Sequence, residues 1–273
     1  MKQSFQFNFQ PTTNNNNNSH SHNLNLEQNI KDLNIVPSDS LFDVDTCYDS
    51  EKVVIHDCLT LWKRKSSNLV SKYFGVEQDV IRGVYEGGFK LWEGAIDLVK
   101  FLDTININGF QRGLELGCGH GLPGIYALQK GIEMDFQDFN ESVITQVLFP
   151  NIVLNKCTVQ ASKSLFLAGD WSSLIHPQLK NKYDCLLASE VVYRTEWFPI
   201  LSDCLLYLLK EDGVAYIAGK CFYFGVGGGT TAFQSFLRTR QELSCACVDK
   251  IQDGKSNVRE ILQVKKLNKT HNE

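Results

Sequence analysis

The sequence predicts an α/β fold in which a mostly parallel sheet is covered by helices on both faces. From residue 113 onward, stretches with strand character alternate with stretches of helical periodicity, which is typical of parallel sheets with crossover helices. A glycine-rich turn, Leu-Glu-Leu-Gly-Cys-Gly-His-Gly-Leu-Pro-Gly at 114–124, follows the first of these strands. Near the end of the chain, 243–251 and 258–267 flank an Asp-Gly dipeptide, which indicates an antiparallel pair joined by a turn.

The residues before this region divide into a tail and an extension. We expect 1–30 to be a disordered, asparagine-rich tail, because it has almost no charge and too few aliphatic side chains to offset the entropy of ordering. Residues 31–80 are expected to pack as an N-terminal extension on the main domain at 81–273. Within this extension, 53–55 has the character of an edge strand, whereas 58–80 shows no clear pattern.

The remaining elements follow from hydrophobic periodicity. A helix is predicted over 91–103, and the helix with the clearest apolar face is predicted at 196–210. Pro150 is expected to end or kink the helix that begins near Glu141. The other predicted strands lie near 112–117, 131–137, 163–168, 183–189 and 213–219, and the other predicted helices near 121–130, 141–155 and 230–243.

Composition and charge argue against several classes of protein. The net charge is −4 and no basic stripe is visible, which disfavours a nucleic acid as the direct substrate. Nine cysteines are scattered without a C-x-x-C pair, and most lie in apolar runs, so we expect free thiols in a reducing compartment and no metal site. No apolar stretch approaches 18 residues and the first residues carry no apolar signal core, so neither a membrane partner nor secretion is expected.

Gly117, Gly119 and Gly121 predict a nucleotide-like ligand at the end of the first core strand. Glycine takes positive φ without strain and lets a ligand approach closely, while the following helix start offers unpaired N–H groups. Two interpretations compete. With Gly124 the turn satisfies the G-x-G-x-x-G pattern of dinucleotide enzymes. Glu115, two residues before Gly117, instead resembles the first motif of S-adenosylmethionine-dependent methyltransferases, where a carboxylate serves the ligand ammonium directly or through water.

Further candidate residues follow the other strands, because ligands of open α/β sheets lie at the carboxyl ends of the strands. Asp138 comes about twenty residues after the glycine turn, a spacing suited to both ribose hydroxyls, with an N-cap role as the alternative. Asp170 and Trp171 suit an adenine amino group and a ring face, or equally a helix cap with a packed indole. Ser189 and Glu190 end the fourth strand, next to the expected position of a transferable methyl group.

A second glycine-rich segment, at 220–230, follows the fifth strand. It lacks the Gly-Lys-Ser/Thr of a phosphate loop. We interpret it as a mobile lip beside an aromatic platform of Phe222, Tyr223 and Phe224, with a plain flexible loop as the alternative.

In combination, these motifs resemble the histidine protein methyltransferase family of the seven-strand, Rossmann-like S-adenosylmethionine-dependent methyltransferases. The resemblance covers about 50–267 in colinear order. Its most specific parts are Gly-Val-Tyr-Glu-Gly-Gly at 83–88 and Tyr-Phe-Gly-Val-Gly-Gly-Gly at 223–229, whereas Leu-Gly-Cys-Gly at 116–119 marks only the superfamily. The other matching positions are Lys90, Trp92-Glu93, 136–140, 169–172 and Ser189-Glu190.

This resemblance implies a protein-histidine N-methyltransferase that uses S-adenosyl-L-methionine and modifies one histidine of a large-subunit ribosomal protein. We expect a monomer in the cytoplasm and nucleus, with the nucleolus as one option. Glu115 departs slightly from relatives that often have Asp, and the asparagine tail has no usable counterpart. The implied cofactor contacts are Leu91, Trp92, Glu93, Gly94, Gly117, Gln137, Asp138, Gly169, Asp170, Trp171 and Ser189, to which we add Glu115, Gly119 and Phe139.

Positioning is the catalytic demand that we expect at this site. Imidazole titrates near pH 6.5, so about three quarters of an unperturbed histidine is neutral at pH 7. Aligning nitrogen, methyl carbon and sulfur can supply on the order of 7 to 11 kcal/mol. We expect Glu190 or Glu93 to accept the other ring N–H, and Tyr223 and Trp92 to sandwich the ring. His120 is a less favoured base, expected beneath the cofactor or on the surface.

Three other functions stay open at this point. The same fold serves methylation of a protein lysine, whose ammonium would first have to lose a proton. A nicotinamide oxidoreductase is supported only by the G-x-G-x-x-G match. A non-catalytic module that binds a ribosomal protein would not need the methyl donor, and the complete set of expected cofactor residues counts against it.

Overall fold

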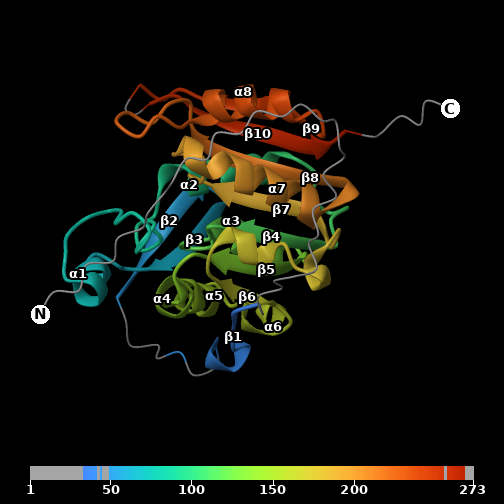
Figure 1. Ribbon diagram of the computed structural model, residues 1–273. Helices are drawn as coiled ribbons and strands as arrows, with labels where there is room; N and C mark the ends of the chain where they lie inside the picture. The colour runs from blue at the N-terminus through green and yellow to red at the C-terminus, as the bar shows by residue number, and fades with distance from the viewer. Residues whose placement is uncertain (1–32, 42–43, 45–48, 255–256, 268–273) are drawn as a thin grey trace, which may run out of the picture. The chain divides into compact units, whose positions relative to one another are not determined.

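The computed structural model describes residues 33–41, 44, 49–254 and 257–267, so the expected asparagine-rich tail at 1–30 lies outside the described residues. The described residues form one compact unit around an eight-stranded sheet with the order β1-β6-β5-β4-β7-β8-β10-β9 (Figure 1). These strands are β1 Ile35–Val36, β4 Arg112–Leu116, β5 Glu133–Asp138, β6 Phe166–Ala168, β7 Tyr183–Ser189, β8 Leu209–Lys220, β9 Leu243–Ile251 and β10 Arg259–Lys266.

The five central strands run parallel and the strands at both ends of the sheet run antiparallel. β6, β5, β4, β7 and β8 pair in parallel, while β10 lies antiparallel between β8 and β9. The predicted mostly parallel sheet with an antiparallel C-terminal pair is therefore confirmed. β1, which pairs antiparallel with β6, was not expected, because two residues carry no periodic signal. Strand order reverses between β4 and β7, which places a ligand crevice outside their carboxyl ends.

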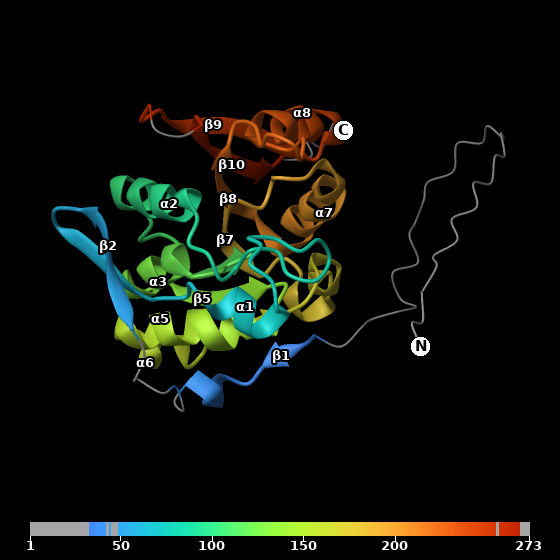
Figure 2. The same cartoon turned by 90° about the vertical axis from the view of Figure 1, so that its left-hand side faces the viewer.

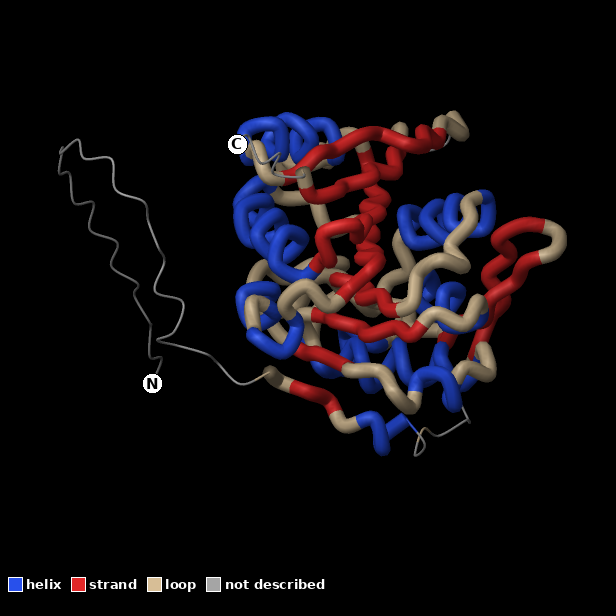
Figure 3. The backbone as a smooth tube through the Cα atoms, turned by 90° about the vertical axis from the view of Figure 1, so that its right-hand side faces the viewer, coloured by secondary structure: helices blue, strands red, loops and turns tan. Residues whose placement is uncertain are grey.

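Helices cover both faces of the sheet. α2 Glu93–Thr104, α3 Leu122–Gln129 and α5 Phe149–Leu154 pack on one face, and α7 Phe198–Leu208 and α8 Thr230–Arg240 pack on the other (Figures 2 and 3). Neighbouring residues of β7 alternate between the two cores: Cys185 and Leu187 join the first, and Leu186 and Ala188 join the second. Burial on both faces explains why this strand reads as a continuous apolar run. None of the helices in the described ranges is long and apolar enough to cross a membrane.

A two-stranded sheet of β2 Ser50–His56 and β3 Leu59–Arg64 lies apart from the main sheet. The edge strand expected at 53–55 is thus a strand, but it does not join the main sheet. Asn155 attaches the hairpin to α5, because its Oδ1 accepts the Trp62 N–H at 2.9 Å and its Nδ2 donates to the Trp62 carbonyl at 2.7 Å. Two further short helices are α1 Leu69–Phe74, which follows β3 in the chain, and α6 Thr158–Ala161, which follows α5.

Pro150 does not end its helix, so the first of the two expected effects, an end or a kink, is wrong. α4 Glu141–Val143 continues through a π-helical turn at Ile144–Leu148 directly into α5, which contains the proline. The Gln146 carbonyl, four residues before Pro150, accepts a hydrogen bond from Arg64 Nη1 at 2.7 Å. Proline has no N–H to donate to this carbonyl. The Arg64 donor replaces that hydrogen bond and the wider π turn gives the ring room, so the helix continues past Pro150.

Candidate functional site

A cavity of about 340 Å³ lies at the carboxyl ends of the parallel strands, where the sheet topology places it. One wall is formed by Val80, Glu86, Gly87, Gly88, Lys90, Leu91, Trp92 and Ala95, and another by Ser189, Glu190, Val191, Tyr193, Arg194, Trp197, Tyr223 and Val226. Most predicted site residues line this cavity: Leu91, Trp92, Gly117, Gly119, Gln137, Asp138, Phe139, Gly169, Asp170, Trp171, Ser189, Glu190 and Tyr223. Three predicted residues, Glu93, Gly94 and Glu115, are not part of the lining.

The glycine turn between β4 and α3 is held in shape by side chains of β5. Gly117 and Gly119 have positive φ, as predicted. The Gly117 N–H donates to Gln137 Oε1 at 3.0 Å, and the Gly119 N–H donates to Asp138 Oδ2 at 2.9 Å. A Cβ at Gly121, the next positive-φ position, would lie 2.2 Å from Leu148 Cδ1. The turn therefore needs glycine for both conformation and space.

Glu115 contacts the helix that follows this turn and does not line the cavity. Its side chain is fully buried, and Oε2 accepts the Gly124 N–H of α3 at 2.8 Å. Oε1 has no hydrogen-bond partner in the part of the chain that the structure describes. Burial raises the pKa of this carboxyl to about 8. The geometry gives Glu115 a contact with the start of α3, and its expected service to a ligand ammonium stays a prediction.

Gln137 joins three strand ends. In addition to the Gly117 N–H, its Oε1 accepts the Trp171 indole N–H at 3.0 Å, and its Nε2 donates to the Gly169 carbonyl at 2.7 Å. The loops that follow β4 and β6 are therefore fixed relative to β5 by one amide. This network was not foreseen, because it depends on which loops the sheet brings together.

Asp138 and Asp170 end neighbouring strands but have different surroundings. Asp138 is buried and accepts the N–H groups of Gly119 and Asn140, and burial raises its pKa to about 6. It does not cap α4, whose N-cap Asn140 makes no side-chain capping bond. Asp170 accepts the Ser172 N–H at 2.8 Å and so caps the 3₁₀ turn Trp171–Leu174. The capping alternative thus holds for Asp170, which also lines the cavity.

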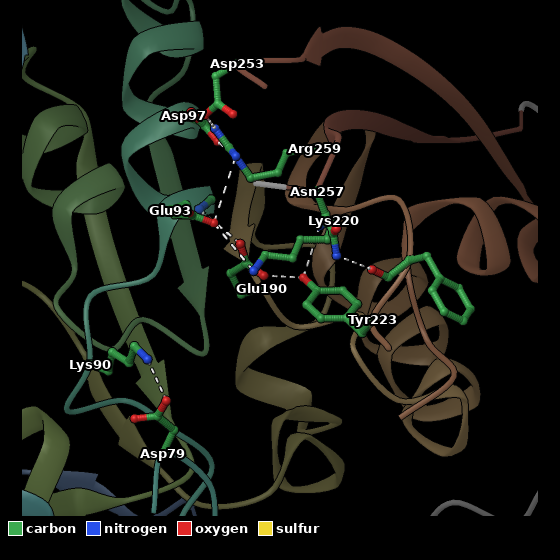
Figure 4. Close-up of polar contacts among 12 residues, drawn as sticks. Asp79, Lys90, Glu93, Asp97, Glu190, Lys220, Tyr223, Asp253, Asn257 and Arg259 are labelled. Atoms are coloured by element: carbon green, nitrogen blue, oxygen red, sulfur yellow. Dashed lines mark hydrogen bonds and ion pairs between the residues drawn. The ribbon is translucent and has the colours of Figure 1, made fainter. Parts of the chain in front are cut away.

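Glu190 is constrained in both its backbone and its side chain. Its φ is +58°, a left-handed conformation that is strained for a residue with a side chain. Oε1 accepts the Gly94 N–H at 3.0 Å and Oε2 accepts the Tyr223 hydroxyl (Figure 4). The Tyr223 oxygen in turn accepts the Lys220 N–H at 3.1 Å. Burial is the main cause of a raised pKa at Glu190.

Gly94 and Glu93 contact other protein groups, and their expected cofactor contacts stay predictions. The backbone N–H of Gly94 holds Glu190, and a Cβ at this position would lie 2.8 Å from Glu190 Oε1. Glu93 is half exposed and pairs with cations, with Oε2 3.5 Å from Lys220 Nζ and 3.9 Å from Arg259 Nη1 (Figure 4). Of the two acids considered for orienting a substrate ring, only Glu190 lines the cavity.

Several lining residues were missed by sequence reasoning. Tyr193 donates its hydroxyl to Glu86 Oε2, which joins the two walls of the cavity, and Arg194 and Trp197 follow it along the chain. No pattern pointed to them; position just after a strand end was their one signal. His120 lines the floor, where it is buried against the Phe89 carbonyl at 3.0 Å, and burial lowers its pKa to about 4.

The glycine loop at 222–229 is hydrogen-bonded to the chain beside it, which corrects the expectation of a mobile lip. The Gly228 N–H donates to the Tyr193 carbonyl at 3.1 Å and the Gly229 N–H donates to the Val192 carbonyl at 2.8 Å. A Cβ at Gly228 would lie 2.2 Å from the Tyr193 carbonyl carbon, so glycine allows this close docking. Of the expected aromatic platform only Tyr223 lines the cavity; Phe222 and Phe224 are exposed.

Comparison with known proteins places these observations among methyltransferases. A family model described as lysine methyltransferase matches residues 71–222. The chain is 43% identical over 189 residues to the histidine protein methyltransferase 1 homolog of Dictyostelium discoideum, covering 68% of this chain and 60% of that protein. It is 37% identical to the Bos taurus homolog, covering 68% and 58% respectively. It is 26% identical to EEF1A lysine methyltransferase 3 of Mus musculus, covering 48% and 55%. The chain spans about three fifths of the length of the first two relatives.

Proposed function

Because the chain belongs to the lysine methyltransferase family, whose model covers more than half of it, we propose that it transfers a methyl group from S-adenosylmethionine to a nitrogen of a protein side chain. We propose further that this side chain is a histidine. The observation that carries the choice is the contrast among relatives: 43% identity over 68% of this chain to a histidine methyltransferase homolog, against 26% over 48% to a lysine methyltransferase.

The residues of the cavity fit the methyl donor. The glycine turn offers a surface without side chains, and we propose that Asp138, which lines the cavity at the end of β5, accepts ribose hydroxyls. Trp171 and Asp170 at the end of β6 offer an aromatic face and an acceptor for a purine. The donor supplies an electrophilic methyl group on its sulfonium when it is bound. Every residue named here lines one continuous cavity, which supports a single binding site for the donor.

Glu190 is the residue that we propose to orient the acceptor ring. Each of its oxygens already accepts one hydrogen bond, and a carboxylate oxygen has two lone pairs, so one further ring N–H can be accepted. This bond would fix the tautomer and leave the lone pair of the other nitrogen free to attack. The Tyr223 hydroxyl and the Gly94 N–H hold the carboxylate in place, so little reorganisation is needed when the substrate enters.

We propose that aromatic side chains enclose the acceptor ring. Trp92 and Tyr223 both line the cavity, as such a sandwich requires. The Trp92 indole is already anchored, because its Nε1 donates to the Gly87 carbonyl at 3.0 Å and the Lys90 ammonium lies 4.6 Å from its ring centroid. Tyr193 meets Tyr223 edge to face with ring centroids 6.3 Å apart, so Tyr193 is a second candidate for the wall that faces the acceptor ring.

The proposed substrate is one large-subunit ribosomal protein, as the family resemblance implies, and the proposed compartments are the cytoplasm and nucleus. The test is methyl transfer from labelled S-adenosylmethionine into an extract of cells that lack this protein, followed by hydrolysis and identification of the labelled amino acid. We expect label in methylhistidine of a single protein. Label in methyllysine would keep the donor and the fold and would reject the histidine assignment.

A further inference from the structure

The glycine loop presents an apolar surface directly beside the cavity. Phe222, Phe224 and Val226 are 48%, 76% and 43% exposed, and the two phenylalanine rings meet edge to face with centroids 5.1 Å apart. We call the surface formed by these two phenylalanines and the neighbouring Val226 the aromatic shelf. Val226 also lines the cavity, as does Tyr223 of the same loop. The shelf is therefore continuous with the cavity wall, and clustered exposed apolar side chains of this kind mark interaction sites.

The shelf is held in place before any partner arrives. Besides the two bonds to Val192 and Tyr193, the Tyr223 N–H donates to the Gly228 carbonyl at 3.0 Å and the Gly227 N–H donates to the Tyr223 carbonyl at 3.1 Å. Asn257 Nδ2 donates to the Phe222 carbonyl on the other side of the loop (Figure 4). Aromatic side chains on a fixed backbone lose little entropy on binding, which favours them as contact residues.

Arg194 adds a polar group next to the shelf. Its backbone forms an antiparallel bridge with Gly227, and its side chain lines the cavity with only 11% exposure. Nη1 is buried and makes no hydrogen bond with any of the residues that the structure describes. The nearest acid, Glu196, is 3.9 Å away and pairs with Arg82 at 2.6 Å. An unsatisfied buried donor costs about 1–3 kcal/mol, which an incoming oxygen would recover.

We propose that the aromatic shelf and Arg194 form the docking surface for the polypeptide that carries the methylated side chain; this rests on the proposed function. A side chain that enters the cavity from a protein must leave its own backbone across the rim, and extended chain advances about 3.3 Å per residue. The residues two or three positions from the acceptor then lie over the loop. An apolar side chain among them contacts the shelf, and an oxygen of the same segment accepts from Arg194 Nη1.

The test compares wild-type protein with a Phe222→Ala/Phe224→Ala variant in transfer of labelled methyl groups to ribosomal proteins from cells that lack the enzyme. The affinity for S-adenosylhomocysteine is measured in parallel by calorimetry. We expect KM for the labelled protein to rise at least about tenfold. The kcat and the affinity for S-adenosylhomocysteine should stay within about twofold of the wild-type values. Phe224→Glu is the second variant, because this highly exposed side chain can change without disturbing the core. Val159→Ala in α6 removes methyl groups from an 80% exposed residue and serves as the control.

Arg194→Ala separates the possible sources of the oxygen. A higher KM with unchanged affinity for S-adenosylhomocysteine supports a contact with the polypeptide. A loss of that affinity instead would assign Nη1 to the cofactor carboxylate and overturn this part of the proposal. Once the labelled protein is known, its acidic residues near the acceptor are replaced by amides. If Arg194 binds an acidic side chain, Arg194→Ala no longer raises KM for this altered substrate. If Arg194 binds a main-chain carbonyl, Arg194→Ala raises KM as before.

The outcomes distinguish this proposal from the proposed function. The identity of the labelled amino acid tests the histidine assignment, whereas the ratio of KM values between variant and wild type tests the docking surface. An unchanged KM in both shelf variants would overturn the docking surface even if methylhistidine is formed. Wild-type protein that labels nothing would overturn both.

Discussion

Glu190→Gln is expected to lower kcat by about 10- to 150-fold while binding of S-adenosylhomocysteine is kept. Glutamine preserves the size of the side chain and can still accept the Gly94 N–H, but its amide group then faces the Tyr223 hydroxyl, whose oxygen already accepts the Lys220 N–H. The variant also loses the charge that would stabilise a ring becoming positive on methylation. A hydrogen bond to a charged group contributes about 1.5–3 kcal/mol, and about 1.4 kcal/mol corresponds to a tenfold change in rate.

The assay for this variant is the initial rate of methyl transfer at saturating donor and substrate, with cofactor affinity measured separately. Glu93→Gln is the matched control, because Glu93 is the same residue type and directly precedes Gly94, whose N–H holds Glu190, but Glu93 is half exposed, pairs with Lys220 and lies outside the lining. We expect the control to keep kcat within about threefold. Full turnover by Glu190→Gln with unchanged cofactor affinity would refute the orienting role of this carboxylate.

Three further predictions follow from contacts around the cavity. Burial raises the pKa of Glu115 from its ordinary 4.5 to about 8, so the folded state keeps a proton that the unfolded state loses, and wild-type stability falls as pH rises through this window. The fall in the free energy of unfolding is at most about 1.4 kcal/mol per pKa unit. Glu115→Gln should lack this fall when urea unfolding at pH 5 is compared with unfolding at pH 8. Gln137→Ala removes three hydrogen bonds that join the loops after β4 and β6, and we expect at least tenfold weaker S-adenosylhomocysteine binding in calorimetry, whereas unchanged affinity would contradict that joining role. Gly228→Ala places a Cβ 2.2 Å from the Tyr193 backbone, so we expect the melting temperature to fall by several degrees, and a melting curve like that of the wild type would mean that the loop is not fastened as described.

The fold was predictable where the chain is buried in a regular pattern. The strand expected at 183–189 is β7 Tyr183–Ser189, because burial on both faces gives a continuous apolar run that ends at polar residues. β1 pairs only two residues with β6, so its position depends on the sheet and not on its own sequence. Helix continuation through Pro150 depends on Arg64, which is 82 residues from Gln146 in the chain. Local signals could not contain either result.

The sequence predicted which residues lie near the cavity better than it predicted how their side chains are arranged. The ends of parallel strands converge by topology, which is why Gly117, Asp138 and Glu190 line one cavity although they are far apart in sequence. The sequence could not choose between Glu190 and Glu93, because the choice depends on Arg259 and Lys220 drawing Glu93 into an ion network. Arg194 carries no motif, and only its packing beside the glycine loop makes it a candidate.

The most direct test of histidine methylation is mass spectrometry of the large-subunit ribosomal proteins from cells with and without this protein. Fragment spectra assign each methyl group to a residue without any assumption about which residue type is methylated. The account predicts one histidine that carries a methyl group in the presence of the protein and none in its absence, with loss of that methyl group when Glu190→Gln replaces the wild type. A methyl group that appears on lysine, or a histidine that stays methylated without the protein, would contradict it.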